Sequence, residues 1–233
     1  MLSLSVDARA TDRARTLQRT LGLHALVAAR LSAAPGVRTA RVLGWLVSLV
    51  FGGAILVLWP RTHGALADVV AVRALKWLSW VGAGLAALST ARDLWTAAAA
   101  DGTVALAAQR GFSRNDLGRT QWIASMTTIA RATLGPGLLL VSLVLMTSRS
   151  LGELAGRALF GLGAISYLVA LAIALGALGR ASVWISARRG RTLLLVLVLV
   201  PCLLERAVPE LGGVTAWANR WLDCLRGVGA SFG

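Results

Sequence analysis

The chain has 233 residues, of which 57% are hydrophobic, and its mean hydropathy is +0.71. An ordinary water-soluble domain cannot bury this much apolar surface, so the composition excludes that class. The net charge of +14 comes almost entirely from arginine. The arginines lie between apolar segments and do not gather in one basic region, which argues against a nucleic-acid-binding protein.

Residues 1–41 are a basic N-terminal region, and residues 9–31 within it have the periodicity of an amphipathic helix. Small and apolar side chains recur on one face and charged side chains on the other. Such a helix either lies in the membrane interface, with arginines at anionic headgroups, or packs on the protein's own spans. In the first arrangement, the residues expected to bind an anionic lipid membrane are Arg13, Arg15, Leu17, Arg19, Leu21 and Arg30.

Three charge-free segments are long enough to cross a membrane or nearly so. The first two, Val42–Pro60 and Ala132–Ser148, contain 19 and 17 residues. The third, Ala158–Gly179, has 22 residues and reaches ~33 Å as a helix, enough for a hydrocarbon core of about 30 Å. Gly135-Pro136-Gly137 is expected to kink or begin the second of these helices.

Two shorter segments leave their arrangement open. Trp77–Ala91 has 15 residues and spans if Ala71, Val72, Ala74 and Leu75 belong to it and Lys76 snorkels. Thr192–Leu204 has 13 residues and fits a re-entrant or interface-lying helix, with Pro201 near its end. Residues 42–204 are therefore the expected membrane-embedded region, followed by a short C-terminal tail over residues 205–233.

The predicted fold class is an all-α integral membrane protein with about four spans. Residues 1–41, 92–131 and 180–191 carry net charges of +5, +2 and +4, whereas residues 61–76 and 149–157 carry +2 and +1. The positive-inside rule then places both termini on the cytosolic side, although the neutral tail leaves the side of the C-terminus open.

Small residues in and before the fourth span are candidates for close helix packing. They recur at four-residue spacing, which allows two helix backbones to approach within one chain or between copies in a homo-oligomer. The candidates are Gly152, Gly156, Ser166, Ala170 and Ala174.

The sequence contains no recognisable catalytic or metal-binding pattern. His24 and His63 are the only histidines, and Cys202 and Cys224 do not form a disulfide or zinc spacing. We therefore expect no enzyme activity, cofactor or metal. The charge-free segments contain no Asp, Glu or Arg, which argues against active transport and less strongly against a passive pore.

The segment Thr11-Asp12-Arg13-Ala14-Arg15-Thr16-Leu17-Gln18 resembles the N-terminal motif of the peroxin-11 family of peroxisomal membrane proteins. Residues 37–44 are similar to the basic helix that follows in that family, residues 74–79 and 91–95 to its central apolar segment, and residues 188–213 to its C-terminal region. The glycine expected after Asp12 is absent and Arg19 stands where an aromatic residue is expected, which suggests a divergent, glycosomal type of member.

The resemblance implies a protein of the peroxisomal or glycosomal membrane with both ends in the cytosol. Such a protein inserts its N-terminal helix to bend and elongate the membrane before division, forms homo-oligomers and recruits fission machinery. Two alternatives stay open: a non-selective metabolite channel or transporter subunit, suggested by the Gly/Ala/Ser-rich spans, and an assembly factor of the mitochondrial or plasma membrane.

Overall fold

A computed structural model describes residues 22–62, 66–92, 102–185, 189–204 and 214–231 of the protein. Within these ranges the backbone is helical apart from short turns and contains no strand. Four of the described helices are long and apolar enough to cross a membrane. The predicted all-α membrane fold class is therefore confirmed.

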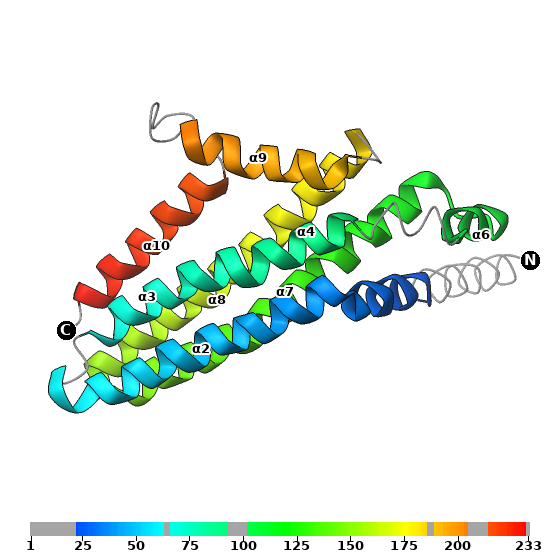
Figure 1. Ribbon diagram of the computed structural model, residues 1–233. Coiled ribbons are helices and arrows are strands. Elements are labelled where there is room, and N and C mark those ends of the chain that lie inside the picture. Colours follow the sequence, from blue (N-terminus) through cyan, green and yellow to red (C-terminus); the bar gives the residue numbers. More distant parts are fainter. Residues whose placement is uncertain (1–21, 63–65, 93–101, 186–188, 205–213, 232–233) are drawn as a thin grey trace, which may run out of the picture.

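The core of the molecule is an up-and-down bundle of two helical hairpins (Figure 1). The helices are α2 (Pro35–Thr62), α3 (Ala67–Trp77), the π-helix η1 (Leu78–Gly84), α4 (Leu85–Arg92), α6 (Thr103–Gln109), α7 (Arg114–Met146), α8 (Leu151–Ile185), α9 (Gly190–Leu204) and α10 (Val214–Ser231). The first hairpin pairs α2 with the continuous rod of α3, η1 and α4, and the second pairs α7 with α8. The central helices thus reach past the ends of the charge-free segments.

The second predicted segment forms its longer helix, which is long and apolar enough to cross a membrane. Residues 67–92 form one uninterrupted rod of 26 residues, about 39 Å long, that includes the Trp77–Ala91 segment. Ala71, Ala74 and Leu75 are buried within the bundle, which explains why the rod extends toward Ala67. Lys76 lies inside this span.

α7 begins at Arg114 because Ser113 caps it. The Ser113 hydroxyl accepts a hydrogen bond from the Asp116 backbone N–H (3.1 Å), and the Asp116 carboxylate accepts one from the Ser113 backbone N–H (3.1 Å). Two donors that a helix start leaves unpaired are thereby satisfied. The expectation that a helix could begin at Gly135 is therefore wrong.

Gly135-Pro136-Gly137 instead lies inside α7, where it lets neighbouring helices approach. Pro136 has no N–H, so the Ala132 carbonyl loses its helical donor. That oxygen faces Gly44 of α2, where an added Cβ would lie 3.2 Å away. Gly137 leaves room for the Leu168 side chain of α8. The stretch therefore serves as the meeting point of α2, α7 and α8.

The predicted packing residues of α8 are not its closest contacts within the chain. Ser166 and Gly152 are exposed and Gly156 is buried, while Ala170 and Ala174 are half-buried. The tightest approaches of α8 involve other glycines, which face α7 and α10. These are Gly161 against Val141, Gly163 against Leu225 and Gly176 against Met126. A contact between copies through Ser166, Ala170 and Ala174 stays a prediction.

α9 and α10 are among the described helices that lie outside the bundle of four. α9 is the short apolar helix predicted from Thr192, and it continues through Pro201 to Leu204. α10 packs against α8 and α3 and runs back along the bundle (Figure 1). The prediction of only a short tail over residues 205–233 missed α10, because Arg220, Asp223 and Arg226 interrupt its apolar residues.

The contact between Gly176 and α7 should be sensitive to side-chain size. A Cβ at residue 176 would lie 3.3 Å from both the backbone N and the Cα of Met126, and backbone atoms yield less than a flexible side chain. We expect Gly176→Leu to lower the free energy of unfolding by about 1–3 kcal/mol through overpacking. Reversible unfolding in micelles, followed by circular dichroism, measures this change.

Gly53→Leu is the matched control, since Gly53 is exposed on α2 and an added Cβ there would meet no atom within 4 Å. Equal stability of the two variants would contradict the packing assigned to α7 and α8.

Candidate functional site

The predicted membrane-binding helix is described from residue 22 onward. Its candidates Arg13, Arg15, Leu17, Arg19 and Leu21 lie outside the described residues. Residues 22–33 are helical, and Val27 and Leu31 are buried against Ala124 of α7, while Arg30 is half-buried. In this part the helix packs on the protein's own bundle, which is the second of the two arrangements predicted from its periodicity.

The two hairpins bring arginine-rich segments to one end of the bundle. Thr90 near the end of α4 accepts a hydrogen bond from Ser125 in α7 (3.0 Å), and Gly118 of α7 lies against Arg180 near the end of α8. The exposed arginines in these neighbouring segments are Arg38, Arg92, Arg119, Arg180, Arg189 and Arg191. We call this region the arginine-rich end.

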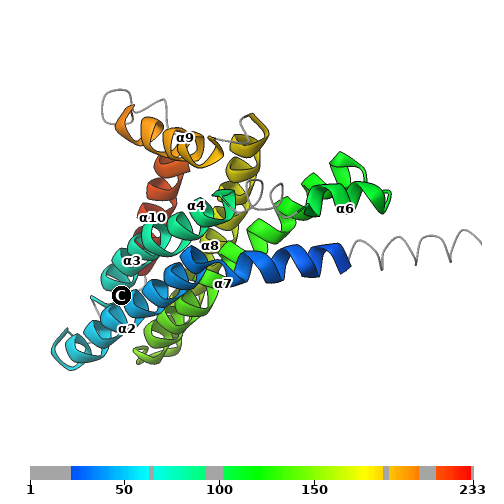
Figure 2. The same cartoon turned by 45° about the vertical axis from the view of Figure 1, so that its right-hand side comes forward.

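α9 crosses the direction of the bundle helices next to this end (Figures 1 and 2). It contacts α4, α8 and α10. Its inner side includes the buried Leu194 and the half-buried Val198. Its large exposed apolar residues are Leu195, Val196, Leu197, Leu199 and Val200.

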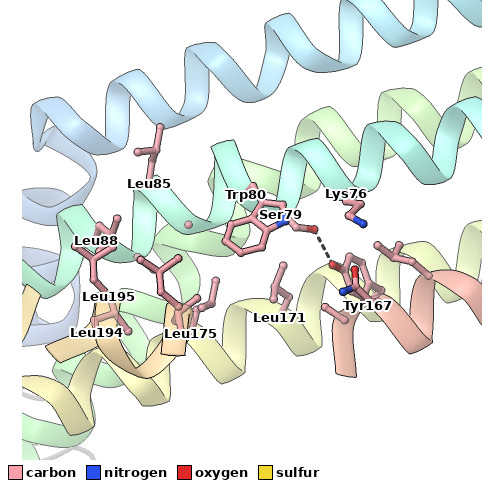
Figure 3. A pocket seen from close by; sticks show the side chains of 17 residues that line it. Lys76, Ser79, Trp80, Leu85, Leu88, Tyr167, Leu171, Leu175, Leu194 and Leu195 are labelled. Atoms are coloured by element: carbon pink, nitrogen blue, oxygen red, sulfur yellow. Dashed lines mark hydrogen bonds between the residues drawn. The ribbon is translucent and has the colours of Figure 1, made fainter. Parts of the chain in front are cut away.

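A cavity of about 260 Å³ lies beneath α9, bounded by the rod of α3, η1 and α4 and by α8 and α10. Most of its lining is apolar. Five lining residues are exposed, namely Lys76, Trp80, Leu85, Leu195 and Leu199, so the cavity opens to the outer surface of the bundle. The two ends of the cavity differ: Lys76, Ser79 and Tyr167 gather at one end, and Leu88, Leu194 and Leu195 at the other (Figure 3).

The π-helix η1 forms part of the cavity wall. π-helical turns are rare and are often found at functional sites. Ser79 and Trp80 belong to this turn, and Ser79 donates a hydrogen bond to the Leu75 carbonyl (2.7 Å). Its hydroxyl also lies 2.7 Å from the Tyr167 hydroxyl. Since Ser79 has one proton, Tyr167 donates to Ser79, and this pair is satisfied inside an apolar wall.

Aromatic contacts with Tyr167 hold α10 beside this polar end. The Tyr167 ring is stacked with Trp217, with ring centroids 6.0 Å apart, and Trp217 meets Trp221 edge to face at 5.1 Å. Such pairs contribute about 0.5–1.5 kcal/mol beyond their buried area. Asn219, between the two tryptophans in sequence, also lines the cavity. Sequence reasoning missed Tyr167 and α10, although Trp217, Trp221 and Leu225 share a four-residue spacing.

Charged residues occur inside the candidate spans, contrary to what the charge-free segments indicated. Lys76 lies within the span Ala67–Arg92, and the buried Arg157 lies within Leu151–Val183. Arg157 donates a hydrogen bond to Thr147 and lies 3.9 Å from a Glu153 carboxylate oxygen. The sequence argument against active transport stays a prediction, because the candidate spans are longer than a hydrocarbon core and Arg157 lies near one end of its helix.

Within the described ranges, no group of three or more His, Cys, Asp or Glu side chains could hold a metal ion. Comparison with protein-family models, with curated proteins and with solved structures finds no match. The resemblance of residues 11–18 to the peroxin-11 family therefore stays a prediction.

The aromatic cluster should control the position of α10. We expect Tyr167→Ala to cost about 3–5 kcal/mol of stability, because it removes a fully buried ring on which Trp217 is stacked. Tyr167→Phe keeps the ring and loses only one hydrogen bond, so it should lower the stability by only about 0.5–1.5 kcal/mol. Unfolding followed by tryptophan emission distinguishes the two variants, and equal losses would contradict the role assigned to the ring.

Proposed function

We propose that the protein remodels the membrane in which it is embedded by adding helix volume to one leaflet. The observation that carries this proposal is α9, an apolar helix that crosses the bundle beside the arginine-rich end. With 15 residues α9 is about 22 Å long, too short to cross the bilayer. Five of its large apolar residues are nevertheless exposed, and three of them, Val196, Leu197 and Val200, do not line the cavity beneath it. Its favourable location is the acyl layer of a single leaflet.

A helix that occupies one leaflet expands that leaflet relative to the other. Amphipathic and apolar interfacial helices bind with a strength that depends on curvature, because they fill area near the headgroups. The arginine-rich end supports this placement, since an arginine near an anionic surface contributes about 1 kcal/mol. The protein is then wider in the leaflet of the arginine-rich end, and curvature toward that side follows.

The N-terminal region adds to this proposal. Its basic amphipathic pattern over residues 9–31 suits binding to anionic lipid, and the packing of residues 22–33 on α7 anchors that segment next to the same end. The resemblance of residues 11–18 supports a peroxisomal or glycosomal membrane with cytosolic termini, homo-oligomers and recruited fission machinery. Imaging of the tagged protein against peroxisomal and mitochondrial markers tests this location, and a purely mitochondrial signal would contradict it.

Membrane remodelling is tested with the full chain inserted from outside into large, preformed vesicles that contain anionic lipid. Digestion of an N-terminal tag by external protease checks that the arginine-rich end stays outside. We expect tubules by electron cryomicroscopy. The triple variant Val196→Ser, Leu197→Ser, Val200→Ser should form few tubules, because burial of each of these apolar side chains in the acyl layer otherwise contributes about 1.5–3 kcal/mol to the insertion of α9.

The matched control changes the same kind of residue at the opposite end of the bundle. Val69, Leu151 and Leu154 are exposed there, with 39%, 86% and 42% of their surface accessible. Replacing these three by serine should leave tubulation at the wild-type level. Tubulation that survives the α9 changes, or that both triple variants lose equally, would refute leaflet insertion by α9.

A further inference from the structure

Lys76 is the single lysine of the chain, and it lies near the middle of a candidate span. The span Ala67–Arg92 has its centre between residues 79 and 80, about 5 Å along the helix axis from Lys76. Ala67 lies about 14 Å from Lys76 along the axis. Snorkelling of Lys76 toward the headgroup layer, expected from the sequence, stays a prediction.

An ammonium group at this depth needs a counter-charge. Ionisable residues within spans are costly, and they usually pair with an opposite charge or line a polar cavity. No ion pair of Lys76 is found among the described residues, and its side chain is exposed at the mouth of the cavity beneath α9. An anion that enters from outside the protein would supply the missing charge.

The cavity provides an apolar compartment next to this charge. Its polar end holds Lys76 and the hydroxyls of Ser79 and Tyr167, and its other end is closed by Leu88 and Leu194 (Figure 3). The cavity of about 260 Å³ is large enough to hold an alkyl chain among these leucines.

We propose that this cavity binds an amphiphile with a single apolar chain and an anionic headgroup. The headgroup contacts Lys76, and the chain lies between α4, α8 and α9 against Leu88, Leu175 and Leu194. This site goes beyond the proposed remodelling and does not depend on it, because no curvature is needed for the ligand to bind.

The direction of the cavity agrees with the orientation of amphiphiles in a bilayer. Lys76 lies on the Ala67 side of the span centre, while Leu88 lies toward the arginine-rich end. An amphiphile from the leaflet on the Ala67 side therefore enters with its headgroup toward that leaflet, and its chain crosses the span centre toward Leu88. The π-helical turn at Leu78–Gly84 forms the wall at this entrance.

Dodecyl phosphate is the probe for this site. The full-length protein in nanodiscs of zwitterionic lipid is titrated with it, and bound molecules are counted by native mass spectrometry. We expect one tightly bound molecule, with affinity about 10- to 100-fold higher than that of dodecanol, because the charged contact is missing in the alcohol. Inorganic phosphate should not bind, since it lacks the chain.

Substitutions at two positions separate the charge from the cavity. Lys76→Gln should reduce the affinity for dodecyl phosphate to that of dodecanol, and Lys76→Arg should keep most of it. Leu194→Trp should fill the cavity and abolish binding of both compounds. Arg73→Gln is the matched control, because Arg73 is exposed on α3 and does not line the cavity.

These binding measurements can contradict the amphiphile site, and they do not test the remodelling proposal. Equal affinities for dodecyl phosphate and dodecanol, or unchanged affinity in Lys76→Gln, would overturn the role of Lys76. If Arg73→Gln lowered the affinity for dodecyl phosphate as much as Lys76→Gln, the effect would come from the general surface charge and not from a specific contact with Lys76. Unchanged binding in a helical Leu194→Trp variant would place the ligand outside the cavity.

Discussion

The absence of water from the hydrocarbon layer is the constraint on which this structure depends. Every backbone N–H and C=O group within the layer must find its partner inside the protein, so the apolar parts of the chain form helices. Lipid chains are as apolar as leucine, and helix association therefore relies on close packing. Gly44, Gly137 and Gly176 provide this packing where α2, α7 and α8 meet. The Ala132 carbonyl freed by Pro136 faces one of these glycines.

The bundle is asymmetric in two directions, and each asymmetry supports a different proposal. Along the bundle axis, α9 and residues 22–33 lie near the arginine-rich end, which supports insertion into one leaflet. Around the axis, the exposed side of α2 is apolar, whereas the exposed side of α3 includes Arg73 and Lys76. The cavity opens on this second side, where a headgroup can neutralise a lysine that lipid chains cannot solvate.

Much of the fold follows from the sequence, because uncharged runs of sufficient length are a direct signal of membrane spans. Segments such as Ala158–Gly179 are found in this way, but their helix ends are not, since capping by Ser113 and burial of Ala71 extend the helices past the charge-free limits. The cavity could not be predicted. It arises where a π-helical turn, α9 and α10 meet, and residue spacing does not reveal contacts between distant helices. The sequence shows that Lys76 is an unusual charged residue in an apolar segment, but it does not show that Lys76 lines the cavity.

The central claim is that the bundle lies across a membrane, and site-directed labelling tests it most directly. In a variant without Cys202 and Cys224, single cysteines replace Ser113 at the arginine-rich end and Ser150 at the opposite end, both exposed. Sealed vesicles are treated with a membrane-impermeant maleimide before and after permeabilisation. The account predicts that one position reacts from outside and the other only after permeabilisation. Reaction of both positions from the same side would contradict it.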